Sequence, residues 1–325
     1  MAITPTRLIW MNGELKPWEE ASVHVLTHAL HYGSAVFEGV RCYATPEGPR
    51  LFRLKDHSQR LVQSGRVYRI DIPYTRDEID AATKCVIAAN GLNSAYVRPL
   101  AFRGFGSIGL VGEECPVETA IAAFPWGAYL GEDGIEKGID VCVSSWQRVA
   151  PNTIPSGVKA AGNYMSSRLI SMEARSRGFA EGIGLSTDGL VSEGAGENLF
   201  LIKDGTLITP PAAASILAGI TRDTVITLAG ELGIEVREQA IPREMLYLAD
   251  EAFFTGTAAE ITPIRSVDRL DVGTGERPVT KALQDAFYGL FTGATPDRWG
   301  WLEPVEQAAA VAMTAPAAQT VSAAE

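Results

Sequence analysis

A glycine-rich stretch near the middle of the chain most constrains its fold. Residues 125–139, PWGAYLGEDGIEKGI, combine several Gly with a Pro and charges of both signs, a composition that favours an interdomain loop over a regular element. The chain of 325 residues also exceeds the roughly 100–200 residues of a usual domain. We therefore expect a small N-terminal domain over 1–130, a loop over 131–138, a larger domain over 139–308 and a loose Ala-, Thr- and Ser-rich tail over 309–325.

Both halves carry signals for strands and helices. Asn12-Gly13 predicts a hairpin, and a turn cluster at 45–50 predicts a second one. Asp56 and Thr75 are expected to cap helices in the first half, and Thr221 one in the second. The remaining predicted elements are strands at 94–102, 184–186, 199–203 and 252–255 and helices at 77–90, 163–177 and 221–232.

Charge and cysteine content exclude several classes of function. Lys and Arg number 28 against 39 Asp and Glu, so the net charge is −11, which disfavours nucleic acid and anionic membrane surfaces as partners. The four Cys are far apart without a CxxC pair, unlike a disulfide scaffold or a zinc site. The N-terminus lacks the apolar core of a signal peptide, and no apolar run is long enough to span a membrane. We expect a soluble cytoplasmic protein.

Two local patterns suggest sites that their surroundings disfavour. Residues 104–109 read GFGSIG, a formal GxGxxG, but the Gly and Pro that follow interrupt the helix that a pyrophosphate site needs. A flexible loop is the better interpretation. His24, His28, His31 and His57 cluster near the start without an obvious set of further ligands, so hydrogen-bonded structural His are expected and no metal site is assigned. A metal-dependent enzyme remains an alternative.

Lys159 stands out among the seven Lys of the chain. It is the only charged residue between Arg148 and Arg168, in VAPNTIPSGVKAAGNYMSS. Small and apolar neighbours indicate partial desolvation, which favours the neutral amine that forms a Schiff base. A surface lysine on a plain loop is an equally good interpretation of this local composition.

A carboxylate and two turns add to this pattern. Glu193 and Glu197 lie among glycines before a hydrophobic strand, and a carboxylate there could keep a pyridine nitrogen protonated, with Asn198 orienting it. Residues 219–221 and 255–258 form small turns that could bind a phosphate, and Arg60 could add charge. Exposed carboxylates and ordinary capped turns are the alternatives.

Longer motifs then resemble one family, the bacterial branched-chain amino-acid aminotransferases of the fold-type IV class of pyridoxal phosphate (PLP) enzymes. The matching segments run in order from about Ile9 to Trp301, and they include HALHYGSAVFEGVRCY, AYVRPL, AAFPWGAYLG, SSWQRVAPNTIPSGVKAAGNY, LVSEGAGENLF and FFTGTAAEITPIRSVD. The resemblance implies an α+β fold of two α/β domains with PLP at the domain interface. It also implies a homodimer at minimum, with hexamers common in the family.

The resemblance assigns roles to individual residues. Lys159 matches the family lysine that forms the Schiff base with PLP and moves the proton during transfer. The other residues that match the cofactor site are Arg60, Tyr164, Glu193, Ile220, Thr221, Gly256 and Thr257. Those that match the substrate site are Tyr32, Phe37, Gly39, Tyr96, Arg98, Trp126, Tyr129, Thr257 and Ala258. Tyr32 is expected to come from the partner subunit.

The implied activity is ping-pong transamination between Leu, Ile or Val and 2-oxoglutarate. Apolar walls suit the branched side chain, while Arg98 with tyrosine hydroxyls suits the side-chain carboxylate of glutamate. A D-amino-acid or (R)-amine aminotransferase, an aminodeoxychorismate lyase and a PLP-free binding protein are the alternatives. Two regions depart from the family pattern, the loop at 103–116 and the extension after Val305, and the loop bears on substrate range.

Overall fold

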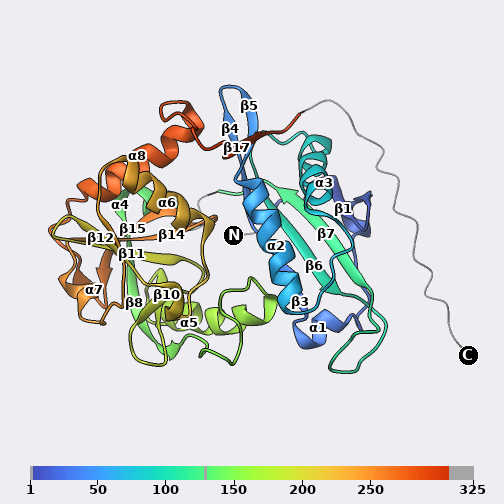
Figure 1. Cartoon of the computed structure of the whole chain (residues 1–325), viewed down its shortest axis with the longest axis horizontal. Helices are drawn as coiled ribbons and strands as arrows, with labels where there is room; N and C mark the ends of the chain where they lie inside the picture. Colours follow the sequence, from blue (N-terminus) through green and yellow to red (C-terminus); the bar gives the residue numbers. More distant parts are fainter. Residues whose placement is uncertain (1–2, 128–129, 307–325) are drawn as a thin grey trace, which may run out of the picture. The chain divides into compact units, whose positions relative to one another are not determined.

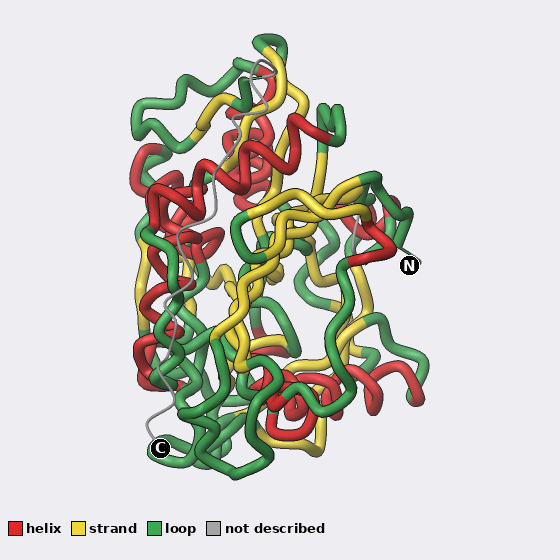
Figure 2. Tube along the Cα trace, turned by 90° about the vertical axis from the view of Figure 1, so that its right-hand side faces the viewer, coloured by secondary structure: helices red, strands yellow, loops and turns green. Residues whose placement is uncertain are grey.

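The computed structural model describes residues 3–127 and 130–306. Contacts within the chain divide it into two compact units. Among the described residues, unit 1 comprises 43–47, 126–127 and 130–302, and unit 2 comprises 3–42, 48–125 and 303–306. Each unit combines helices with a β-sheet, which confirms the α+β class (Figures 1 and 2). The predicted domain bounds stay a prediction, and the predicted tail at 309–325 and Tyr129 lie outside the described residues.

Unit 2 is built on a mainly antiparallel sheet. Its strand order is β17-β5-β4-β6-β7-β1-β2, with β3 paired to β6. The strands are β1 (Leu8–Met11), β2 (Glu14–Pro17), β3 (Ala35–Phe37), β4 (Val40–Thr45), β5 (Gly48–Phe52), β6 (Ala95–Arg103), β7 (Val117–Phe124) and β17 (Leu302–Pro304). The helices are η1 (Trp18–Glu20), α1 (His28–Tyr32), α2 (Leu54–Val67) and α3 (Arg76–Ala89). Helix α3 packs against β1, β6 and β7, and α2 packs against α3 and β3 (Figure 1). Fully buried Leu61, Ile79 and Val86 form the helical side of this core.

Unit 1 is built on a second, mixed sheet. Its strand order is β10-β9-β8-β15-β14-β11-β12-β13, with β16 paired to β15. The strands are β8 (Ile139–Gln147), β9 (Glu181–Leu185), β10 (Val191–Gly194), β11 (Asn198–Lys203), β12 (Thr206–Thr209), β13 (Val236–Glu238), β14 (Glu251–Gly256), β15 (Glu260–Val267) and β16 (Leu270–Asp271). The helices are α4 (Glu132–Lys137), η2 (Ala161–Asn163), α5 (Tyr164–Ser176), η3 (Ala212–Ala214), α6 (Ile220–Glu231), α7 (Met245–Leu248) and α8 (Pro278–Thr292). Helix α5 packs on β8 and β9, while α6 and α8 pack on β14.

Local signals in unit 2 produce the predicted elements. Asn12 and Gly13 both take the left-handed conformation, with φ of 52° and 97°, which the tight turn between β1 and β2 requires. Thr75 caps α3 through a capping box, because its hydroxyl accepts from the Glu78 amide and the Glu78 carboxylate accepts from the Thr75 amide. The predicted hairpin at Asn12-Gly13 and the predicted cap at Thr75 are confirmed.

Two predicted helix caps are wrong. Helix α2 begins at Leu54, so Asp56 lies in its first turn, where its carboxylate binds the Arg53 Nε at 2.6 Å. Helix α6 begins at Ile220 with Gly219 at the N-cap position, and Thr221 is a buried residue of the helix. The helix starts one residue earlier than the sequence suggests, and its N-cap must be glycine because a Cβ on residue 219 would lie 2.0 Å from the Asn198 Oδ1.

The GFGSIG segment is a loop. Gly104 donates its amide to the Pro116 carbonyl at 2.7 Å, and the next element is the strand β7. No helix follows the glycines, as expected. The nearby His28 is held on both sides of its ring, by Ser34 Oγ at 2.7 Å and the Gly109 carbonyl at 2.8 Å, so it has the structural role that we expected. Among the described helices, none combines the length and apolar character needed to cross a membrane.

Candidate functional site

Lys159 meets a tyrosine hydroxyl in unit 1. It lies in the loop between β8 and η2, and its Nζ donates to the Tyr164 Oη at 2.6 Å. The single turn η2 brings these two side chains together at the start of α5. Asn163 fixes the loop, because its Nδ2 donates to the carbonyls of Pro155 and Val158 at 3.0 and 2.8 Å. An amine and a phenol are therefore held side by side by local backbone geometry.

Glu193 is the buried anion of this site. Its Oε1 accepts from the Arg148 Nη2 at 2.5 Å, and its Oε2 accepts from the Asn198 Nδ2 and the Leu217 amide, each at 3.0 Å. Burial raises the pKa of Glu193 to about 7, although Arg148 lowers it. The carboxyl therefore stands near the point where it gains or loses a proton at neutral pH, and Asn198 orients it as the sequence predicted.

Arg148 is a site residue that the sequence analysis missed. Besides the ion pair with Glu193, its Nη1 donates to the Ser167 Oγ at 2.9 Å on α5. Both side chains of the ion pair are less than a tenth exposed. The partners are 45 residues apart, so no local pattern marks them, and only the packing of β8, β10 and α5 brings them together.

Asn198 also links the two predicted phosphate turns. Its Nδ2 donates to the Leu217 carbonyl at 2.8 Å, in the loop that leads into α6. Its backbone pairs with Thr255 in the β11–β14 ladder, directly before Gly256. The N-terminus of α6, with Ile220 and Thr221, and the turn of Gly256, Thr257 and Ala258 are thus both anchored at one residue. Backbone amides at such a helix start favour a bound anion.

Unit 2 gathers the residues predicted to recognise the side chain of the substrate. The Arg98 Nη2 donates to the Tyr96 Oη at 3.0 Å, and its guanidinium lies 4.7 Å from the centre of the Phe37 ring. The buried Arg98 Nε has no hydrogen-bond partner, and no carboxylate among residues 3–127 and 130–306 forms an ion pair with Arg98. A guanidinium with an unused hydrogen-bond donor and no ion-pair partner is suited to bind the carboxylate of a substrate.

Gly39 is required by the same group. A Cβ at this position would lie 2.0 Å from the Tyr96 Oη and 2.7 Å from its Cζ, closer than any real contact permits. The backbone between β3 and β4 therefore passes directly beside the tyrosine hydroxyl. This close approach explains why a residue without a side chain occupies the position.

Arg60 is held by a carboxylate that the sequence analysis did not single out. Its Nε and Nη2 donate to the two oxygens of Glu38 at 2.6 and 2.9 Å, and His57 Nδ1 lies 2.7 Å from the Glu38 Oε2. Although burial alone would raise it, Arg60 and His57 hold the pKa of Glu38 well below its usual range. Glu38 thereby fixes the orientation of the predicted phosphate-binding arginine.

The remaining predicted residues lie at the edges of these groups. Tyr32 on α1 is 43% exposed, and its hydroxyl donates to the Ile108 carbonyl at 2.9 Å. Trp126 is half-buried at the first residue of the longer part of unit 1. Tyr32 is therefore accessible on the surface of unit 2.

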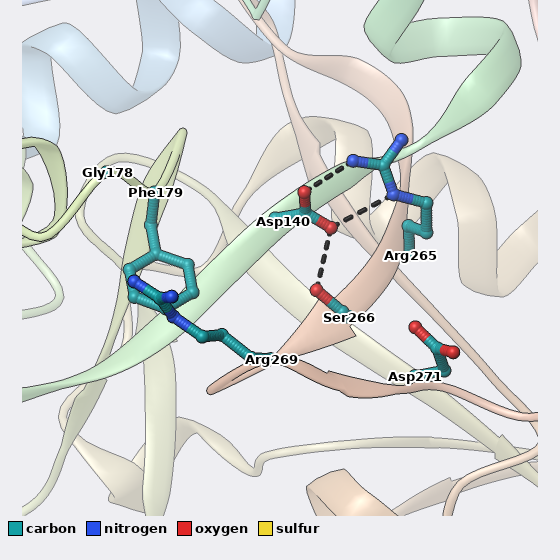
Figure 3. Close-up of a pocket in the computed structure, with 7 residues that line it drawn as sticks. All are labelled: Asp140, Gly178, Phe179, Arg265, Ser266, Arg269 and Asp271. Carbon is teal, nitrogen blue, oxygen red and sulfur yellow. Dashed lines mark hydrogen bonds and ion pairs between the residues drawn. The ribbon is translucent and has the colours of Figure 1, made fainter.

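A separate pocket on unit 1 contains none of the predicted residues. It has a volume of about 440 Å³ and is lined by Asp140, Gly178, Phe179, Arg265, Ser266, Arg269 and Asp271 (Figure 3). Arg265 is paired with Asp140, and Arg269 lies over the Phe179 ring at 5.5 Å. Its principal cations are thus already engaged by neighbours.

Comparison with known proteins decides the family. The model of the amino-transferase class IV family matches residues 35–267. The chain belongs to the class IV aminotransferases. This class IV aminotransferase is 58% identical over 304 residues to the branched-chain-amino-acid aminotransferase of Escherichia coli K12, covering 92% of this chain and 97% of the relative.

Solved structures of related aminotransferases share its fold. The crystal structure of the Escherichia coli branched-chain amino acid aminotransferase superposes with a TM-score of 0.91 at 56% identity, covering 93% of this chain and 100% of the other. The branched-chain amino acid aminotransferase from Thermobaculum terrenum, in its PLP-bound holo form, gives a TM-score of 0.86 at 39% identity, covering 93% and 99%. The resemblance and the fold-type IV class drawn from the sequence are confirmed.

Proposed function

We propose that this class IV aminotransferase transfers the amino group between the branched-chain L-amino acids leucine, isoleucine and valine and 2-oxoglutarate. The products are branched 2-oxo acids and L-glutamate. The observation that carries the proposal is the 58% identity, over 92% of the chain, to an enzyme named for branched-chain amino acids. Such an enzyme completes the synthesis of these amino acids or begins their breakdown.

The residues of unit 1 fit PLP as the cofactor. Lys159 offers the amine, Tyr164 a hydroxyl for the phenolic oxygen, and Glu193 a buried carboxylate for the pyridine nitrogen. The helix start at Ile220 and Thr221 and the turn at Gly256 and Thr257 offer amides to the phosphate, and Arg60, a residue of unit 2, is proposed to add charge. When bound, PLP acts as an electron sink for the substrate carbon.

Each residue then has a definite task. The Lys159 amine lies 2.6 Å from the Tyr164 hydroxyl. Its proposed task is to move a proton between the α-carbon of the substrate and the carbon of the cofactor. Glu193 keeps a proton on the pyridine nitrogen, and Arg148 favours the ionised form of Glu193 that this requires. Asn198 and the Leu217 amide hold the carboxylate in one orientation, which avoids reorganisation during the reaction.

Two kinds of side chain must fit one substrate pocket. Phe37, Gly39 and Trp126 supply its apolar walls, and Arg98 with Tyr32 and Tyr129 supplies the polar group for glutamate. The open hydrogen-bonding capacity of Arg98 supports this assignment. The substrate α-carboxylate is assigned to the amides of Thr257 and Ala258 with the Tyr96 hydroxyl.

A homodimer at minimum, with a hexamer as the larger assembly, is the proposed state of the enzyme in the cytoplasm. An exposed apolar patch around α1 and the GFGSIG loop supports it, with Val25, Leu30, Ile108, Leu110 and Val111 each at least 62% exposed. A second copy covering this patch removes it from water, and brings Tyr32 to the partner's pocket. Mixed Lys159→Ala and Tyr32→Ala chains should regain activity, because one site of each mixed dimer is intact. No recovery would refute a shared site.

An amino-donor panel with 2-oxoglutarate tests the reaction. L-leucine, L-isoleucine and L-valine should react faster than D-alanine or (R)-phenylethylamine, and the reverse order would overturn the proposal in favour of another fold-type IV enzyme. Lys159→Ala should abolish turnover, whereas the surface variant Lys203→Ala should retain it, since the Lys203 ammonium pairs with Asp250 at the surface.

A further inference from the structure

Two buried carboxyls in unit 1 have no role in the mechanism above. Glu181 is the first residue of β9 and is 1% exposed, and Glu197 directly precedes β11 and is 4% exposed. Glu181 accepts from the Ser171 Oγ, at 2.7 and 2.9 Å to its two oxygens, and from the Gly182 amide at 2.7 Å. The Glu197 Oε2 accepts from the Gly196 amide at 3.0 Å.

Neither carboxyl has a cationic partner. Within residues 3–127 and 130–306, no Lys, Arg or His forms an ion pair with Glu181 or Glu197, in contrast to Glu193 with its Arg148. An ionised carboxylate buried without an ion-pair partner is strongly unfavourable, because it loses its hydration and gains no compensating charge. The negative charge of Glu181 also acts on Glu197. Two buried carboxyls in this situation are more stable with one proton between them than with two negative charges.

Two glycines make room for Glu197. A Cβ on Gly194 would lie 2.7 Å from the Glu197 Oε2, so only glycine admits the carboxyl where it lies. A Cβ on Gly256 would lie 3.9 and 4.0 Å from the Cα and Cγ of Glu197, which places the side chain along that backbone. Glu197 is thus packed against the start of the turn that contains Thr257 and Ala258.

The groups around the pair come from several elements. Burial raises the pKa of Glu197 to about 8, the negative charges of Glu181 on β9 and Glu193 on β10 raise it too, and Lys159 lowers it. Burial likewise raises the pKa of Glu181, while the Gly182 amide, Ser171 and Arg175 on α5 lower it.

We propose that Glu181 and Glu197 hold one proton between them, and that the resulting neutral carboxyl lets an anionic carboxylate bind at the adjoining turn of Gly256, Thr257 and Ala258. Loss of that proton places a second negative charge beside the turn and repels the anion. Glu197 is then a positioning residue that sets the pH range of substrate binding. This inference rests on the proposed function for its substrate, but the shared proton can be tested without it.

Infrared spectroscopy of the cofactor-free protein tests the proton directly. A protonated carboxyl has a carbonyl stretching band separate from that of a carboxylate. The band should be present at pH 7 and disappear as the pH rises past about 8. Glu193, with a pKa of about 7, contributes to the same band at pH 7, so the comparison is made in the Glu193→Gln background, where adding Glu197→Gln should weaken the band. Glu173→Gln is the matched control, because Glu173 accepts from Ser144 and Ser145 and its pKa is lowered; this variant should keep the band.

Glu181→Gln supplies a second variant should Glu197→Gln fail to fold. Removing the like charge of Glu181 should lower the pH at which the Glu197 band disappears. Absence of a protonated carboxyl at pH 7 in the Glu193→Gln protein, or a band unchanged when either Glu197→Gln or Glu181→Gln is added, would overturn the shared proton. These results do not depend on which substrates the enzyme accepts.

Kinetics with a branched 2-oxo acid test the consequence. This substrate has no amine that titrates near pH 9, so its KM reports on the site. KM should rise about tenfold between pH 7 and pH 9 in the native enzyme, because a group with a pKa of about 8 is mostly ionised at pH 9. Glu197→Gln should flatten this rise with little change in kcat, and Glu173→Gln should retain it. An equal rise in Glu197→Gln would refute the link to anion binding.

Discussion

Replacing Arg148 with Met tests the electrostatic design of the site most sharply. The guanidinium is buried beside Glu193, with the Nη2 and Oε1 atoms 2.5 Å apart. Methionine preserves much of the volume but removes the charge. Glu193 then keeps its bonds from Asn198 and the Leu217 amide and loses its only described ion-pair partner. We expect the variant to fold less stably in a manner that depends on pH.

The magnitude follows from the protonation of Glu193. Removing one partner of a buried ion pair typically lowers the free energy of unfolding by about 3–5 kcal/mol. Glu193 can limit this loss by taking up a proton, since its pKa is already about 7 with Arg148 present and rises further without it. Above pH 7, Glu193 is ionised both in the folded native protein and in its unfolded chain. In the folded variant, Glu193 still carries a proton, whereas in the unfolded variant it does not. The gap in stability should therefore grow by about 1.4 kcal/mol per pH unit above pH 7.

Urea unfolding of the cofactor-free protein at pH 6, 7, 8 and 9 measures this gap, at one protein concentration so that assembly stays constant. Arg265→Met is the matched control, because its ion pair with Asp140 is half exposed (Figure 3) and should contribute no more than about 1 kcal/mol. In the double variant Arg148→Met with Glu193→Gln, the growth of the gap above pH 7 should vanish. A constant gap across this range, or a loss equal to that of Arg265→Met, would refute the reasoning.

Two further predictions concern the substrate group of unit 2. Gly39→Ala places a Cβ 2.0 Å from the Tyr96 Oη, so we expect it to displace the hydroxyl and raise KM for both substrates at least tenfold. The control Gly230→Ala, with open space around its Cβ, should leave KM unchanged. Similar KM values in both variants would contradict the close approach of residue 39 to the tyrosine. Arg98→Met should slow the glutamate half-reaction about ten- to a hundredfold more than the leucine half-reaction, because a charge-assisted contact is worth about 1.5–3 kcal/mol. Single-turnover kinetics measure both half-reactions, and equal losses would argue against a pocket shared by two kinds of side chain.

The local structures that the sequence predicts correctly depend on residues that are adjacent or nearly adjacent in the chain. The Asn12-Gly13 turn and the Thr75–Glu78 capping box each need at most four consecutive positions. The two wrong caps show the limit of the same logic. Asp56 is a suitable capping residue by type, but Arg53 engages it and the helix begins earlier. At Thr221, the helix already begins at Ile220, and the N-cap position is taken by Gly219, which leaves no room for a side chain beside Asn198.

The sequence by itself determined the family and the α+β class, and it nominated the candidate site, because its long motifs survive as contiguous strings around Lys159 and Glu193. It did not reveal Arg148 or Glu38, although each binds a predicted site residue through its side chain. These pairs span 45 and 22 residues. Only tertiary packing decides such contacts, because the burial that makes a charge need its partner arises when distant strands and helices close around it.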